Sequence, residues 1–189
     1  MFGIVVIGFY LVAAGLPAWS AWRGREQLRV GAVGAGLAGA AAVAHVLWLS
    51  GTLRADAGYA LDIGAALSLF GLVVGSIGVL LALRQAFRAP AAILLATAGV
   101  LAVGTGSLST LREGHEPGRP LSAHITLSAL AFGLLATAAL LTVVLAVQDA
   151  SLRSRRPSGW LEALPPMESM EHAVFMLLRT GFIALSLTL

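Results

Sequence analysis

Six long apolar stretches dominate this chain of 189 residues. They run over residues 2–21, 31–51, 61–83, 90–107, 121–147 and 172–189, and short linkers that contain charged residues or proline separate them. A helix needs about 20 predominantly apolar residues to cross the hydrocarbon layer of a bilayer, where it satisfies its own backbone hydrogen bonds. The pattern therefore predicts an all-α fold, a polytopic integral membrane bundle of about six transmembrane helices.

The composition excludes a soluble globular enzyme. Hydrophobic residues make up 58% of the chain and charged residues 11%, whereas soluble domains carry roughly 45–50% apolar and about 25% charged residues. Disorder is excluded for the opposite reason, because apolar residues prevail and the net charge is only +3. No linker has the length or composition of a soluble domain, so residues 1–189 are predicted to form a single transmembrane helical domain.

The polar residues restrict the possible ligands. All twelve basic residues are arginines, and eleven of them are scattered through short linkers instead of being gathered on one face, so no nucleic-acid partner is expected. The chain has no cysteine, which excludes disulfides, thiolate metal sites and thiol redox chemistry within it. A metal would have to be bound by histidines or carboxylates.

The distribution of arginine predicts the orientation of the helices. Residues 1–22 carry no positive charge ahead of their apolar run, unlike a secretory signal peptide, and are expected to be a retained transmembrane helix. Cytoplasmic loops retain positive charge, so the N-terminus is predicted to lie outside. The linkers after the first, third and fifth stretches hold Arg23, Arg25, Arg29, Arg84, Arg88, Arg153, Arg155 and Arg156, and the other two hold Arg54, Arg112 and Arg119.

Two of the predicted helices carry a face of small residues. In the third, the spacing of four and three residues places the small side chains on one side, and small residues let helices pack closely in lipid. In the second, Gly34, Ala38 and Ala41 form a similar face that leads to His45. This second face is expected either to pack against a helix or to floor a pocket for a flat ligand. The stripe of the third helix consists of Gly64, Ser68, Gly71, Gly75, Gly78 and Ala82.

His45 and His124 are the candidate ligand residues. Both are predicted in the outer half of the membrane, on different helices, with depths that differ by roughly 9 Å at the helical rise. Ionisable residues inside a span are costly and therefore functional candidates, and neutral imidazole is an axial ligand of haem iron. The alternative is a hydrogen bond from each histidine to a carbonyl or to a Ser or Thr. His115 is expected in an outer loop and His172 at the cytoplasmic mouth of the last helix.

Arg179 is an arginine well inside the last apolar stretch. Its guanidinium is expected to snorkel, to pair with Glu171, or to bind an anionic group such as a haem propionate. Other catalytic patterns are missing from the sequence: there is no glycine-rich loop after a strand, no His-Glu-x-x-His and no pair of intramembrane carboxylates. The chain also lacks the two histidines on each of two helices that a two-haem four-helix cytochrome needs.

The segment from Leu121 onward resembles the cytochrome c assembly protein family, in its branch of CcsA-, YpjD- and HemX-like membrane proteins. The resemblance rests on His124 and the following Ile-Thr-Leu-Ser-Ala-Leu-Ala-Phe-Gly, on Gln148, and on Leu164-Pro165-Pro166-Met167. It continues through Glu171, Phe175 and Gly181-Phe182 into Leu-Ser-Leu-Thr-Leu. The earlier Ala-His45-Val-Leu-Trp-Leu and the outside N-terminus fit the same pattern.

The resemblance implies a haem-binding or haem-handling protein of cytochrome c biogenesis, in the bacterial inner (cytoplasmic) membrane. It implies b-type, non-covalently bound haem near the outer face, with His45 and His124 as axial candidates. Its partners would be another membrane protein of the assembly pathway and apocytochrome c, and an assembly factor is expected in preference to a classical enzyme. Family members usually have two further helices after the region matched here. The resemblance gives no role to Arg179 or His172.

A transporter or ion-transport accessory subunit without haem is the alternative. A cation pathway requires acids at mid-depth of the bundle, and the acids Asp62 and Glu171 are predicted near opposite membrane faces instead. In a third possibility, a purely structural subunit, His45 and His124 would be replaceable.

Overall fold

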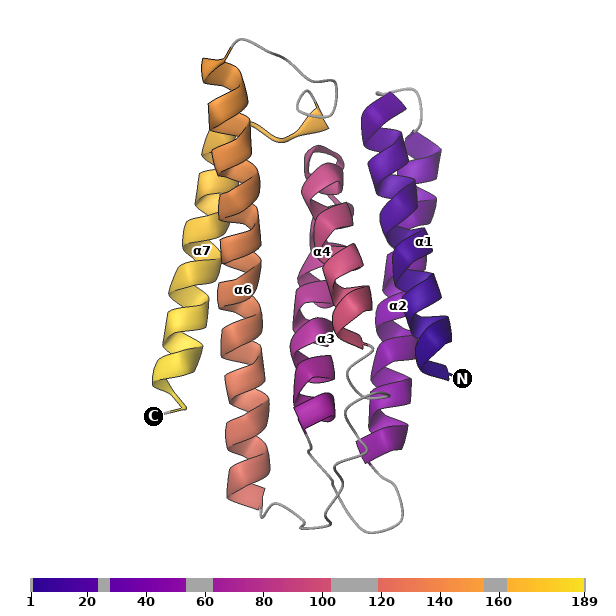
Figure 1. Ribbon diagram of the computed structural model, residues 1–189, viewed down its shortest axis with the longest axis vertical. Coiled ribbons are helices and arrows are strands. Elements are labelled where there is room, and N and C mark those ends of the chain that lie inside the picture. The colour runs from indigo at the N-terminus through magenta and orange to yellow at the C-terminus, as the bar shows by residue number, and fades with distance from the viewer. Residues whose placement is uncertain (1, 24–27, 54–62, 103–118, 155–162, 189) are drawn as a thin grey trace.

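The helices predicted from the apolar stretches form in the computed structural model of the chain, shown in Figure 1. The structure describes residues 2–23, 28–53, 63–102, 119–154 and 163–188, with side chains over 5–19, 30–51, 63–102, 121–154 and 163–188. These residues contain no strand, so the all-α fold class is confirmed. The elements are α1 (Phe2–Arg23), α2 (Leu28–Leu53), α3 (Ile63–Ala82), the 3-10 helix η2 (Gln85–Phe87), α4 (Arg88–Ala102), α6 (Arg119–Arg153) and α7 (Met167–Ser186).

Four helices are long and apolar enough to cross a membrane. Their candidate spans are Val30–Gly51, Ile63–Ala82, Gln85–Ala102 and Leu121–Arg153. Helix α1 contributes the shorter apolar stretch Val5–Trp19 among the residues searched, and α7 carries Glu168, Glu171, His172 and Arg179. A helical membrane bundle is therefore confirmed, while membrane crossing by the first and last helices stays a prediction.

Consecutive helices run in opposite directions (Figure 1). The C-terminal ends of α1, α3 and α6 consequently lie at one end of the molecule, together with the N-terminal ends of α2, α4 and α7. We call this the arginine-rich end, because Arg84, Arg88 and Arg153 belong to it. The alternation brings the helix ends that flank the predicted arginine-rich linkers to the same side, as the predicted topology requires, and which side faces the cytoplasm stays a prediction.

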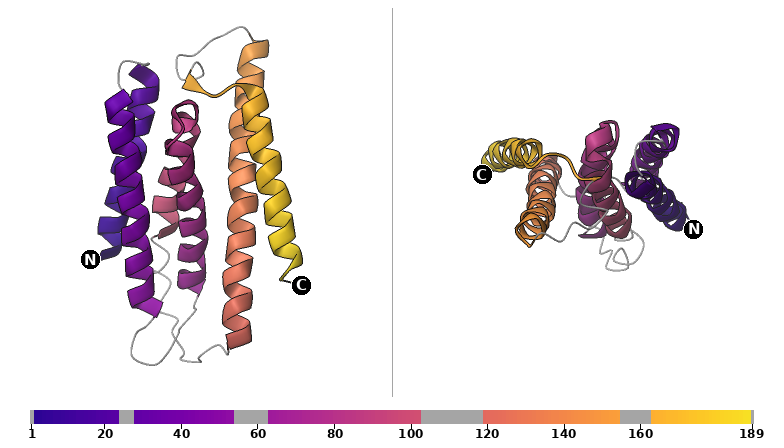
Figure 2. Two further views of the ribbon diagram at one scale, coloured as in Figure 1. Left: turned by 180° about the vertical axis from the view of Figure 1, so that it is seen from behind. Right: turned by 90° about the horizontal axis from the view of Figure 1, so that it is seen from above.

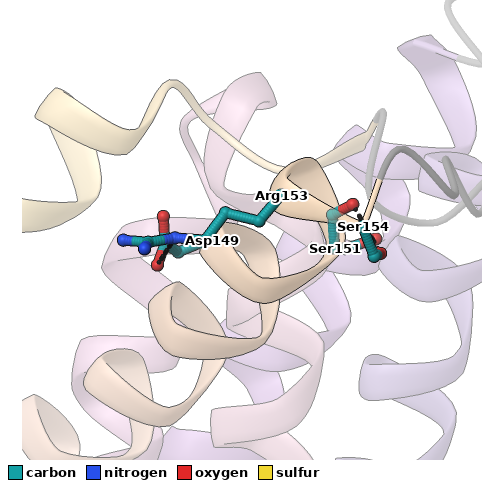
Figure 3. Close-up of polar contacts among 4 residues, drawn as sticks. All are labelled: Asp149, Ser151, Arg153 and Ser154. Atoms are coloured by element: carbon teal, nitrogen blue, oxygen red, sulfur yellow. Dashed lines mark hydrogen bonds and ion pairs between the residues drawn. The ribbon is translucent and has the colours of Figure 1, made fainter.

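Helix α6 continues beyond the apolar stretch predicted to end at residue 147. Its 35 residues span about 52 Å at the helical rise, well beyond a hydrocarbon layer of about 30 Å. The last turns are polar, and Arg153 Nε donates to Asp149 Oδ2 over 2.9 Å across one turn (Figure 3). Pairs at this spacing support an exposed helix only modestly, so we infer that these turns project from the membrane into water.

Helices α1, α2, α3 and α4 pack in a closed ring in which each contacts the next and α4 returns to α1. The hairpin of α6 and α7 lies on one side of this ring, mainly against α3 (Figure 2). The ring is filled by α1, α2 and α4 side chains, among them Val6, Tyr10, Ala41 and Leu95. Helix α3 is thus the element that joins the ring to the hairpin.

The small-residue stripe of α3 is buried along its whole length, as predicted: Gly64, Ser68, Gly71, Gly75, Gly78 and Ala82. A Cβ atom added at Gly71 would lie 2.7 Å from Leu101 Cβ, and one added at Gly78 would lie 3.2 Å from Leu94 Cβ. Because α4 approaches this closely, no larger residue fits without separating the two helices. The stripe is the contact surface between α3 and the rest of the ring.

Gln148 fixes the connection between α6 and α7. Its side chain is buried, and Nε2 donates to the carbonyl oxygen of Pro165 over 3.1 Å. Nearby, Phe87 packs with Leu141, Met170 and Val174 in an apolar cluster. The Leu-Pro-Pro-Met segment that contributes to the family resemblance is therefore the anchored start of α7.

Candidate functional site

His45 lies at the end of the small face of α2 and is completely buried. The residues that lead to it, Gly34, Ala38 and Ala41, are buried as well. A Cβ atom added at Gly34 would lie 3.0 Å from Pro17 Cδ, and Ala38 and Ala41 pack with Tyr10 and Ala13 of α1. This face therefore packs against a helix. Helix α1 occupies the space in which a flat ligand was expected as the alternative.

Both ring nitrogens of His45 have hydrogen-bond partners. Nε2 lies 2.7 Å from Ser68 Oγ on α3, and Nδ1 lies 3.3 Å from Tyr10 Oη on α1. The Tyr10 and Ser68 side chains are, like His45, fully buried. A neutral ring with its hydrogen on Nε2 donates to Ser68 and accepts from the Tyr10 hydroxyl, which pairs both nitrogens. Three helices are thus connected through one imidazole.

Aromatic contacts hold the imidazole in place. The Tyr10 ring meets it edge to face with centroids 5.7 Å apart, and the Trp48 ring lies 6.1 Å away on the same helix. Gly75 of α3 is what admits Tyr10, since a Cβ atom there would lie 2.7 Å from Tyr10 Oη. The stripe thus packs the helices and also makes room for the hydrogen-bonded tyrosine.

His124 has very different surroundings. It is exposed on α6, near the end of the helix that is opposite the arginine-rich end. Among the described residues its imidazole has no hydrogen-bond or ion-pair partner, and the nearby Thr126 hydroxyl donates to the Ser122 carbonyl instead. An exposed, unpartnered imidazole is free to bind an added group.

The two histidines lie on opposite sides of α3. Ser68 bonds His45 on the α2 side, whereas Gly133 of α6 packs against Val73 and Phe70 on the other side. Because α3 and α6 run in the same direction, this contact places Ser68 roughly level with Ser128. His124 then lies about 6 Å closer to the opposite end than His45. The structure brings both into the same half of the bundle but does not bring them together.

Arg179 is exposed on α7, and no described residue pairs with it. Gly181 packs against Leu134 and Leu135 of the antiparallel α6, which places Arg179 level with about residue 137. Along the α6 axis this level is about 20 Å from His124. This separation does not favour one haem with its iron at His124 and a propionate at Arg179. Glu171, the other predicted partner, lies about 12 Å away along α7 and forms no ion pair with it.

The remaining candidates do not add to a site. His172 is exposed near the start of α7, at the arginine-rich end, and His115 and Asp62 lie outside the described residues. Within the parts of the chain that the structure describes, no three His, Cys, Asp or Glu side chains gather to hold a metal ion. Comparisons with protein-family models, curated proteins and solved structures give no match for this chain.

The sequence singled out His45 as a candidate ligand residue, with a hydrogen bond to a Ser or Thr as the alternative. The structure contains the hydrogen bond, to Ser68. Tyr10 was missed, because an aromatic residue inside an apolar run gives no sign of the helix that it will contact. Trp48 was noted only within the family resemblance, although its place three residues after His45 puts the two side chains on one face of a helix. Ser68 was noted only for its small size. One signal was available: a polar residue within each of two small-residue faces indicates a hydrogen bond between those faces.

Proposed function

We propose that this protein binds haem in the membrane and handles it during cytochrome c assembly. The single observation that carries the proposal is His124, an exposed imidazole on a long apolar helix without a partner among the described residues. Neutral imidazole is a natural axial ligand of haem iron. An ionisable residue within a membrane span is energetically costly, so a histidine found there is a functional candidate.

His124 fits a haem ligand better than His45 does. Iron coordination needs a free nitrogen lone pair, and the His45 nitrogens are occupied by Tyr10 and Ser68. Leu121, three residues before His124 on the same face of α6, is also exposed and offers apolar contact to a porphyrin. In this proposal His124 supplies one axial ligand and His45 positions α2 against α1 and α3.

The resemblance over residues 121–187 supports the same process. It suggests b-type, non-covalently bound haem held toward the outer face of a bacterial cytoplasmic membrane. The recipient would be apocytochrome c, reached together with another membrane protein of the pathway. A ligand-transfer role needs no side-chain nucleophile, so we propose an assembly factor and not a classical enzyme.

The haem content of the purified, detergent-solubilised protein tests the proposal. We expect an absorption band of bound haem in the Soret region and a positive pyridine haemochrome assay. His124→Ala should lose most of this haem or shift the band, and added imidazole should partly restore the spectrum. Because His124 is exposed, the variant should keep the thermal stability of the original protein.

His172→Ala is the matched control, since His172 is also exposed on a helix but lies at the arginine-rich end. It should retain both haem and spectrum. His45→Ala should lower thermal stability. Its haem content should fall only to the extent that the protein unfolds. Haem content that survives His124→Ala and falls with His172→Ala would refute the assignment, and absence of haem from all preparations supplied with it would refute the function.

A further inference from the structure

The outward face of α7 carries a charged residue among exposed apolar side chains. One face of α7 is buried against α6, with Met170, Val174, Gly181 and Ala184. The other face exposes Phe175, Met176, Phe182 and Ile183, and Arg179 and Thr180 stand among these apolar side chains. Thr180 bonds the Met176 carbonyl of its own helix, which leaves Arg179 as the unpaired polar group.

The contacts of α7 place Arg179 far from either end of the bundle. It is level with about residue 137 of α6, within the apolar stretch 121–147, and lies at that depth if α7 crosses the membrane as predicted. Side chains on a helix lean toward its N-terminus, and the start of α7 at Met167 lies about 18 Å from Arg179 along the axis. Even His172, the nearest polar residue toward that end, lies about 10 Å from Arg179 along the axis, farther than an arginine side chain extends, so snorkelling relieves only part of the cost of the charge.

No acid of the described helices lies near this level. Asp149, Glu168 and Glu171 all belong to the arginine-rich end. A second copy of the chain in the same membrane has the same orientation, so its described acids stand equally far from this depth, and its Arg179 would repel. No carboxylate of the described residues is thus available to the Arg179 guanidinium, and charge complementarity favours one carried by a helix outside this set.

We propose that the exposed face of α7 around Phe175, Arg179 and Phe182 is a docking surface for a transmembrane helix of a partner protein, one that carries an Asp or Glu at mid-depth. The carboxylate pairs with the Arg179 guanidinium by charge-assisted hydrogen bonds, and the flanking phenylalanines pack against the apolar neighbours of the acid. Because an unpaired charge in lipid is costly, a helix that carries an acid at the depth of Arg179 gains more from docking here than a helix without one.

A designed helix tests this surface without a partner of known identity. The probe is a synthetic Leu/Ala transmembrane peptide with one central Glu, and matched peptides carry Gln or Leu at the same position. Association with the full chain is measured by energy transfer in zwitterionic phosphatidylcholine vesicles. We expect the Glu peptide to associate on the order of tenfold more tightly than the Leu peptide, and Arg179→Leu to abolish this difference.

Arg84→Leu is the matched control, because Arg84 is also exposed but lies at the arginine-rich end; it should keep the preference for Glu. A charge exchange gives a second test: Arg179→Glu should prefer a peptide with a central Lys. Equal association of the Glu and Leu peptides overturns the proposal. Two other results also overturn it. One is energy transfer between two labelled copies of the chain that disappears when both carry Arg179→Leu. The other is a peptide association that depends on Arg179 only in vesicles with anionic phosphatidylglycerol.

Discussion

Gly71→Ala tests the packing of α3 by adding one methyl group to the small-residue stripe. The new Cβ atom would lie 2.7 Å from Leu101 Cβ and 3.4 Å from the Ala98 carbonyl oxygen. Nonbonded carbon atoms prefer about 3.5–4.0 Å, so α3 and α4 must move apart by about 1 Å. Neither contact atom is the end of a flexible side chain, and the strain cannot be relieved by rotating a side chain.

The change in the free energy of unfolding is the sum of two opposing effects. Overpacking of this kind destabilises by about 1–3 kcal/mol, and replacing a helical glycine with alanine recovers roughly 0.5–1 kcal/mol. Gly36→Ala in α2 is the matched control, because no atom lies within 4 Å of a Cβ atom added there. The control carries only the favourable effect. The two variants should therefore differ in unfolding free energy by about 1–3 kcal/mol, with Gly71→Ala the less stable.

The assay is unfolding of the purified protein in mixed micelles by increasing sodium dodecyl sulfate, followed by tryptophan fluorescence. Trp48 packs against the core of the ring and reports its opening. Equal unfolding midpoints for Gly71→Ala and Gly36→Ala would refute the close approach of α3 and α4. A Gly71→Leu variant should be worse than Gly71→Ala, since it adds further bulk to the same contact.

Three further predictions concern other contacts. Gly133→Ala, whose Cβ atom would lie 2.7 Å from Val73 Cβ, should be about 1–3 kcal/mol less stable than Gly15→Ala, which has open space around its added Cβ atom. It should also expose the hairpin of α6 and α7 to protease, and the reverse order of stability would contradict the docking of α6 on α3. Tyr10→Phe and Ser68→Ala should each lower the unfolding free energy by roughly 0.6–1.7 kcal/mol in the same detergent titration. Ser76→Ala, on the exposed side of α3, is the control and should change it little. Unchanged stability in both variants would mean that the His45 hydrogen bonds contribute nothing. Single cysteines at Ser107 and Ser154 should react differently with an impermeant thiol reagent added to intact cells, with Ser107 accessible from outside; labelling of Ser154 alone would invert the predicted topology.

Much of the fold follows from the sequence, because in lipid the length of an apolar run sets the length of the helix. The predicted stretch 61–83 became Ile63–Ala82, and the small residues of α3 proved to be its buried face. The boundaries were least accurate where apolarity ends before helicity does. Helix α6 continues six residues past 147 because Gln148 and Asp149 gain partners there, and α7 starts five residues before 172.

The candidate site was less predictable, since its properties depend on which helices are neighbours. His45 and His124 look alike in the sequence, as single histidines in apolar runs that are both predicted in the outer half of the membrane. The first meets Tyr10 and Ser68 only because the ring of α1–α4 closes around it. The second stays exposed because it lies on the hairpin outside the ring. Helix order and spacing contain no information about this difference.

The position of α3 between the two histidines restricts how a haem function is organised. Its stripe contacts α4, α1 and His45 on the ring side, and Val73 and Phe70 contact Gly133 on the hairpin side. A ligand shared by both histidines would require α3 to leave one of these contacts, and Ser68 would have to release His45. Movement of the hairpin alone changes the surroundings of His124 and leaves the His45 hydrogen bonds intact. If haem binds at His124 as proposed, the hairpin can therefore change position around it without breaking the His45 hydrogen bonds inside the ring.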